Sequence, residues 1–271
     1  MHTPPLFHTC PRAVRAAATR LAFDVDDTIT HKGRLPSVVV RALEDAHAAG
    51  LSLIAVTGRS AAWGELLVRL FPLAACVAET GAVCFVPRAA GGMTVLHHES
   101  DARVRAENAA VRARLADEIL REVPGARLAV DNVGRLVDTA FDLVEDGPRV
   151  DEETARAIRD RLTKAGLTVA QSSVHINAWF GQFDKATMCA RYLRECEGTT
   201  LDDAKDTLVY VGDSMNDGAM FARAGLSVGV ANVRPHLAAL AARGESPRFL
   251  VDGEGGHGFV EVVRALLEAR T

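Results

Sequence analysis

The chain has 271 residues, 48% of them hydrophobic and 24% charged, which is enough for one large domain or two smaller ones. Its net charge of −4, without a dense basic run, argues against nucleic acid as a partner. No apolar stretch reaches the roughly 18 residues of a membrane span. The five cysteines form no CxxC pair and the N-terminus lacks the apolar core of a signal peptide, so we expect a cytoplasmic protein with no membrane partner.

Residues 1–19 contain three prolines and an Arg/Ala segment, and they predict a loosely structured leader. After the leader, apolar runs too short for helices alternate with helical segments, which is typical of a parallel sheet covered on both faces. In the first half we expect a strand from Leu21, a helix over 36–50, a strand over 51–58, a helix over 60–71 and a strand over 73–79. The same alternation returns with strands over 206–212, 226–231 and 247–251 and helices over 217–225, 234–244 and 258–270.

The middle of the chain follows a different rhythm. It predicts hairpins over 82–99 and 126–145, helices over 101–123 and 150–166, and a last pair of strands over 167–180. The order ββαββαββ predicts an antiparallel sheet with helices on one face. We therefore expect a Rossmann-like α/β core, doubly wound, of residues 20–83 and 184–271, and an inserted α+β cap domain of residues 84–183.

Three carboxylates stand directly behind the first apolar run. Asp24 and Asp26, two residues apart, can face one spot, whereas Asp27 points elsewhere. The carboxyl end of a parallel strand is where open α/β sheets keep their ligands. Two such charges tolerate each other if a divalent cation lies between them or if one carries a proton. The alternative is a polar turn in which Asp27 caps a backbone group.

Three further segments fall where the chain enters or leaves the predicted core. Thr57, Gly58 and Arg59 follow the second strand, and Gly212 to Asp217 follow the strand over 206–212. Lys185 lies where the chain returns from the predicted cap. Each has an ordinary explanation, namely a helix-starting Thr, an acidic N-cap or an exposed Lys. Their agreement with the first segment favours one shared pocket.

The four segments resemble the four motifs of the haloacid dehalogenase-like (HAD) phosphohydrolases. The motifs are DxDxT at Asp24 to Thr28, then Thr57, then Lys185, then GDxxxD at Gly212 to Asp217. The insert between Thr57 and Lys185 resembles the type IIB cap of the Cof-type branch, which also contains sucrose-phosphate phosphatases. The resemblance covers about residues 20–271.

The resemblance implies a role for each matched residue. Asp24 would be the nucleophile that forms an aspartyl-phosphate, and Asp26 the acid and then the base. Mg²⁺ would be held by the Asp24 carboxylate, the Asp26 carbonyl and the Asp213 carboxylate, an oxygen set that magnesium prefers. Thr57 and Lys185 would hold the phosphoryl oxygens. The remaining assignments are supporting ones: Asp217, Ser214 and Asn216 around the metal, and Gly58, Arg59 and Asn216 around the substrate.

The expected activity is hydrolysis of a small phosphorylated metabolite, such as a sugar or polyol phosphate. Asp26 favours phosphoryl chemistry over carbon–halogen cleavage, because in this family phosphohydrolases carry an acid/base two residues past the nucleophile. A phosphomutase on the same scaffold and a catalytically idle binding protein stay open as alternatives.

Two weaker signals complete the sequence. His175, Asn177 and Trp179 alternate onto one face of the last expected cap strand, where they would either contact substrate or pack the cap. The GEGGHG run over 253–258 fits a dinucleotide fingerprint, but the chain ends 13 residues later without a second strand. We therefore expect a flexible loop there.

Overall fold

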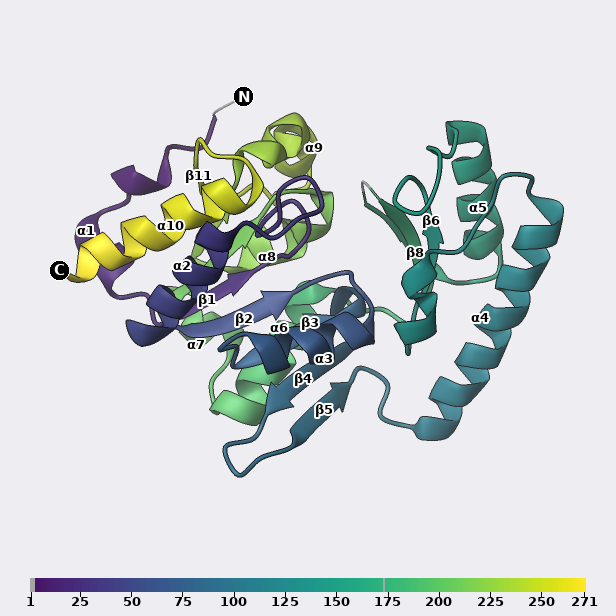
Figure 1. The fold of residues 1–271 in the computed structure, drawn as a ribbon, viewed down its shortest axis with the longest axis horizontal. Coiled ribbons are helices and arrows are strands. Elements are labelled where there is room, and N and C mark those ends of the chain that lie inside the picture. The colour runs from purple at the N-terminus through teal and green to yellow at the C-terminus, as the bar shows by residue number, and fades with distance from the viewer. Residues whose placement is uncertain (1–2, 173) are drawn as a thin grey trace.

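The computed structural model describes residues 3–172 and 174–271, which form a large and a small sheet (Figure 1). Within those residues the large sheet has eight strands, in the order β11 (Phe249–Leu250), β10 (Leu226–Gly229), β9 (Leu208–Gly212), β1 (Arg20–Phe23), β2 (Ser52–Val56), β3 (Ala75–Ala78), β4 (Val83–Pro87) and β5 (Met93–His97). The small sheet has three strands in the order β6 (Thr139–Asp142), β8 (His175–Trp179) and β7 (Thr168–Gln171). The final residue of the expected strand over 167–173 lies outside the described residues.

The strands from β11 to β3 are parallel, and helices cover both of their faces. One apolar cluster joins the sheet to α2 (Ser37–Ala48), α3 (Ala61–Leu70) and α10 (Gly255–Arg270). A second joins the opposite face to α6 (Lys185–Tyr192), α7 (Leu201–Ala204), α8 (Gly218–Arg223) and α9 (Leu237–Ala242). The predicted doubly wound core is confirmed, because its strands are apolar on both faces and need cover on both.

The first predicted cap hairpin belongs to the large sheet instead. β4 pairs antiparallel with β3, and β5 pairs with β4, so the two strands extend the core. The reason is the tight turn Glu79–Gly81, which reverses the chain onto the sheet edge, where Val83 and Cys84 are fully buried. The predicted boundary at residue 84 falls inside β4. We propose that the cap begins after β5.

The small sheet carries its helices on one face, as predicted. α4 (Ala102–Glu122) and α5 (Glu152–Lys164) pack against β6 and β8 through an apolar cluster that includes Ile119, Phe141 and Ile158. Figure 1 shows this unit in teal, beside the core at the side toward which β1 and β2 point. The second predicted hairpin is wrong in its first strand, since residues there make a single bridge, Leu128 to Phe141, before a 3₁₀ turn at Val130–Gly134.

The predicted leader packs on the core rather than lying loose. Phe7 and Cys10 are buried in the first apolar cluster, and the Phe7 ring lies edge-on to Phe249 with centroids 5.7 Å apart. Arg15, in α1 (Arg12–Ala16), donates to the carbonyl of Ala265 in α10 at 2.8 Å. This packing occurs because the two-residue edge strand β11 would otherwise leave apolar surface uncovered.

The expected loop over 253–258 is largely helix. α10 begins at Gly255, whose N–H donates to Asn232 Oδ1 at 2.9 Å, and the next N–H, of Gly256, donates to the Thr30 carbonyl at 3.0 Å. Two of the N–H groups that a cofactor phosphate would use at a helix start are therefore bonded to the protein itself.

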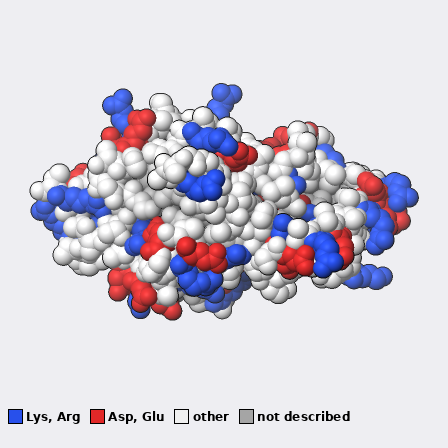
Figure 2. Space-filling model, turned by 90° about the horizontal axis from the view of Figure 1, so that it is seen from below, with Lys and Arg blue, Asp and Glu red and all other residues white. Residues whose placement is uncertain are grey.

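Both signs of charge are interspersed over the face shown in Figure 2. In the part of the chain that the structure describes, no helix has the length and apolar character needed to cross a membrane.

Candidate active site

The site lies where three neighbouring parallel strands end. β1 lies between β9 and β2, with Phe23 level with Val211 and Ala55, so the residues that follow these strands meet at one edge. Asp24, Thr57 and Asp213 are those residues. The sheet thereby brings the first, second and fourth predicted segments together, as expected for ligand sites of open α/β sheets.

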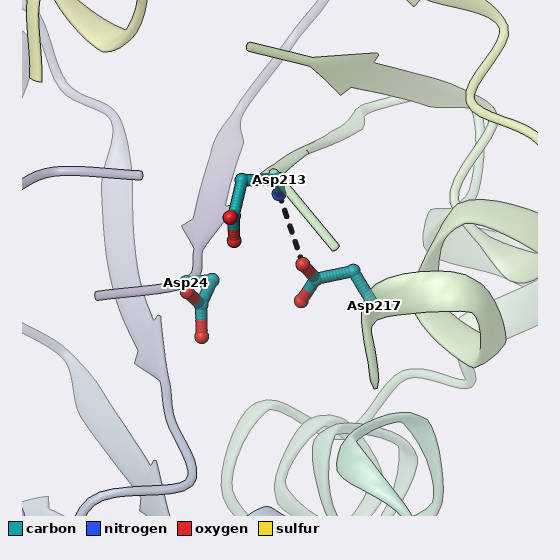
Figure 3. Close-up of side chains that lie close together, drawn as sticks. All are labelled: Asp24, Asp213 and Asp217. Atoms are coloured by element: carbon teal, nitrogen blue, oxygen red, sulfur yellow. Dashed lines mark hydrogen bonds between the residues drawn. The ribbon is translucent and has the colours of Figure 1, made fainter. Parts of the chain in front are cut away.

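Three carboxylates converge at this edge. Figure 3 shows the carboxylates of Asp24, Asp213 and Asp217 close together, and one oxygen from each lies within 4.8 Å of the others. Asp217 is held by the backbone, because its Oδ2 accepts the N–H groups of Asp213 at 2.9 Å and Ser214 at 3.0 Å. Glycine is required at position 212, since a Cβ there would lie 2.6 Å from Asp217 Cγ.

Lys185 joins the acidic groups. Its fully buried Nζ donates to Asp24 Oδ1 at 2.6 Å and Asp217 Oδ1 at 2.7 Å, and it lies 3.3 Å from Asn216 Oδ1. Burial lowers the pKa of Lys185, but the two carboxylates outweigh burial and raise it above its ordinary value. The ammonium is therefore charged. A capping box between Asp184 and Thr187 starts α6 directly before Lys185 and fixes its backbone.

The acidic cluster fits a divalent cation. Burial, then the charges of Asp217 and Asp24, raise the pKa of Asp213 well above its ordinary value, a repulsion that a cation would relieve. Asp213 accepts only a 3.3 Å bond from Thr28 among the described residues, so it is free to bind an ion. Asp217 is not free to bind an ion. Its Oδ1 accepts hydrogen bonds from Lys185 and Tyr210, and its Oδ2 accepts them from backbone N–H groups. Asp24 and Asp213 are the carboxylates that could hold magnesium.

Arg59 links the acid/base candidate to the cap. Its Nε and Nη2 donate to both oxygens of Asp26 at 2.7–3.0 Å. Its Nη1 and Nη2 donate to the two oxygens of Glu145, which follows β6, at 2.9 and 2.8 Å. The guanidinium lies over the Trp63 ring, 5.1 Å from its centroid. Thr57 Oγ1 accepts the Arg59 N–H at 3.0 Å and is fully buried.

A pocket opens between this edge and the cap. On the core side it is lined by Asp24, Asp26, Gly58, Arg59, Thr80, Asp213, Ser214 and Asn216. On the cap side it is lined by Gln171, Ser172, His175 and Asn177 among others. Lys185 and Thr57 are fully buried and lie outside the lining of the pocket.

The structure divides the three predicted cap residues. His175 and Asn177 reach the pocket, and Asn177 donates to Asp138 Oδ2 at 2.7 Å. Trp179 lies outside the lining, 2% exposed, and its ring stacks on Phe183 with centroids 5.1 Å apart. In this arrangement Trp179 packs the base of the cap.

Sequence reasoning missed Glu145, Tyr210 and Glu79. Glu79 accepts N–H groups of Leu136, Val137 and Asp138 in the cap at 2.7–2.9 Å, and that of Ala61 in α3 at 2.9 Å. A fully buried carboxylate thus fastens cap to core. Its position at the carboxyl end of the third parallel strand was a usable signal, because the same rule located Thr57.

The chain is similar to known proteins over most of its length. A model of the haloacid dehalogenase-like hydrolase family matches residues 143–243, which include Lys185 and Asp213 to Asp217. The chain is 28% identical over 248 residues to a phosphoglycolate phosphatase of Methanothermobacter thermautotrophicus, a match that covers 91% of this chain and 98% of that protein.

Solved structures share the fold. The Thermoplasma acidophilum protein 0175 superposes with a TM-score of 0.71 at 18% identity, over 92% of this chain and 98% of the other. The sucrose-phosphatase of Synechocystis sp. PCC6803, solved with sucrose and phosphate, gives 0.62 at 15% identity, over 91% and 97%. The resemblance expected from the four motifs is thus confirmed: residues 143–243, which carry Lys185 and the fourth motif, match the haloacid dehalogenase-like hydrolase family, and the relative that matches over 91% of this chain is named a phosphatase.

Proposed function

We propose that the chain is a Mg²⁺-dependent phosphatase that hydrolyses a small phosphorylated metabolite through an aspartyl-phosphate on Asp24. The observation that carries this proposal is the buried Lys185 ammonium between Asp24 and Asp217 at the strand ends. The ammonium holds one oxygen of Asp24, and no donor from the described residues reaches the other, so that oxygen is available for reaction.

In the first step, an Asp24 oxygen attacks phosphorus and the bond from phosphorus to the leaving oxygen breaks. Asp26, which must first separate from Arg59 and take up a proton, gives that proton to the leaving oxygen, and the product alcohol departs. In the second step, Asp26 takes a proton from water, the water oxygen attacks phosphorus, and phosphate leaves with the Asp24 carboxylate restored. Magnesium held by Asp24 and Asp213 would supply positive charge beside the phosphoryl oxygens. Lys185 and the N–H group of Gly58, which lines the pocket, would supply the rest.

The cap favours a small substrate, because it closes the pocket over the strand ends. It also excludes water from the phosphoryl transfer. The related proteins are named for two substrate types, sucrose phosphate and phosphoglycolate. We propose a sugar or polyol phosphate, since uncharged polar groups (Gln171, Ser172, Asn177) line the cap side of the pocket. A cytoplasmic location also stays our prediction. All five cysteines are free thiols, which is consistent with it.

The test is a phosphate-release screen over about 100 phosphorylated metabolites with Mg²⁺, with parallel assays in a chelator and with Asp24→Asn enzyme. Stoichiometric phosphate release that needs both the metal and Asp24 supports the proposal and excludes a phosphomutase. Failure to turn over any metabolite or an aryl phosphate, with Mg²⁺, Mn²⁺ or Co²⁺, would contradict it and favour the idle binding protein.

A further inference from the structure

The leaving-group side of the pocket contains little free positive charge. Among the described lining residues Arg59 is the one Lys or Arg, against three carboxylates, those of Asp24, Asp26 and Asp213. Lys185 lies behind the lining and is shared by two carboxylates. The phosphoryl group of a substrate brings further negative charge to the same place. Among the described lining residues, Arg59 is then the one permanent cation that could attract a second anionic group on the substrate.

Arg59 is occupied on both sides by carboxylates. Asp26 binds its Nε edge and Glu145 binds its Nη1 and Nη2 edge, each through both oxygens. These contacts use four of the five guanidinium N–H groups, because Nε offers one and Nη2 offers two. The side chain is 10% exposed and one face lies over Trp63. A substrate carboxylate would have to displace Glu145 or accept a position beside it.

Glu145 is anionic at neutral pH. Its neighbours His175 and Arg59 lower its pKa to about 2, against the effect of partial burial. His175 Nε2 lies 3.2 Å from Glu145 Oε2. His175 is itself buried, and it lines the cap side of the pocket beside Asn177.

We propose that Glu145 selects the leaving group: by holding Arg59, it restricts the pocket to phosphate esters of uncharged hydroxylated compounds and disfavours esters with a second negative charge. Glu145 itself stands behind Arg59, outside the pocket lining, so it is a specificity-determining residue and not a catalytic one. This inference rests on the proposed phosphatase function and assigns its substrate class.

The experiment compares two esters of nearly equal size, 2-hydroxyethyl phosphate and phosphoglycolate. The first carries a hydroxymethyl group where the second carries a carboxylate. Phosphate release gives kcat/KM for each with wild-type, Glu145→Gln and Glu145→Ala enzyme. Wild type is expected to favour the uncharged ester. Both variants should lower that preference by about tenfold or more, mainly through a lower KM for phosphoglycolate, because like-charge contacts are costly in a desolvated site.

Glu152→Gln is the matched control. Glu152 is an exposed glutamate of the cap helix α5, and it pairs with Arg159 of the same helix rather than with Arg59. It should leave the preference unchanged. Wild-type enzyme that favours phosphoglycolate overturns the inference whether or not the variants fold. A preference that neither Glu145 variant changes, with melting temperatures near wild type, overturns it as well. Absence of release from both esters and from an aryl phosphate would instead contradict the proposed function, and the inference would fall with it.

Discussion

The two ends of the pocket are built differently. At the phosphate end, Asp24 and Asp217 are buried at the edge of one sheet, and each is bonded to the buried Lys185. At the leaving-group end, Arg59 from the core meets Glu145 from the cap, and Glu145 is 35% exposed. The phosphate end therefore depends on the core fold alone, whereas the leaving-group end exists only while the cap is in place.

This difference separates chemistry from specificity. Groups held by strand ends keep the geometry that phosphoryl transfer needs, and groups on the cap can change without disturbing it. Changing single groups at either end tests this difference, and the change expected to have the largest effect comes first.

Asp24→Asn tests the phosphate end directly. An amide is a poor nucleophile and a weaker metal ligand, so kcat should fall by about 10⁴-fold or more. Phosphate release measures the loss, and a melting temperature close to wild type shows that the fold is intact. A kcat comparable to wild type would remove Asp24 from its proposed role.

Lys185→Met tests how far the phosphate end depends on ion pairing. The change leaves Asp24 and Asp217 as buried carboxylates without their shared cation, which should lower the free energy of unfolding by about 3 kcal/mol or more. Urea denaturation in a chelator measures it. The control is Lys205→Met, because Lys205 is exposed and should lose little. Equal stability of the two variants would show that Asp24 and Asp217 do not need the Lys185 ammonium to remain buried.

Glu79→Gln tests the attachment of the cap. Glutamine offers one acceptor oxygen where the carboxylate offers two, so some of the four N–H groups bonded to Glu79 lose their partner. We expect a loss of about 2 kcal/mol in the free energy of unfolding and faster hydrogen exchange at Leu136, Val137 and Asp138. Glu65→Gln, on the exposed side of α3, is the control. Unchanged exchange at the three cap amides would mean that other contacts hold the cap.

The same division explains which residues the sequence could predict. Asp24, Thr57 and Asp213 follow apolar strands, and parallel strands place their carboxyl ends at one edge, so their convergence follows from local pattern. Glu145 is 86 residues from Arg59, and the Asp-Gly-Pro turn signal that follows it gives no indication of a pocket. Its role arises from how the cap meets the core, which no local pattern encodes.

The two larger errors in the fold have a similar origin. The alternating pattern of β4 and β5 fits either sheet, and the turn Glu79–Gly81, with positive φ at each of its three residues, decides which one they join. The leader looked unstructured because its prolines and short apolar runs give no periodicity. Phe7 is buried nevertheless, because the core offers it an apolar edge at Phe249.

Low pH should weaken the leaving-group end by a small and predictable amount. The folded-state pKa of Glu145 is about 2, below its ordinary value of 4.5, so the ionised carboxylate adds stability above about pH 4.5 that is lost as pH falls toward 2. Because the side chain is more than one-third exposed, solvent screening keeps this contribution modest. The difference in free energy of unfolding between wild type and Glu145→Gln should be constant from pH 6 to 8, roughly, and should shrink between about pH 4.5 and pH 3. Urea denaturation across this range measures it, with Glu152→Gln as the reference. A difference that stays constant down to about pH 3 would mean that Glu145 and Arg59 stabilise the cap through packing and not through charge.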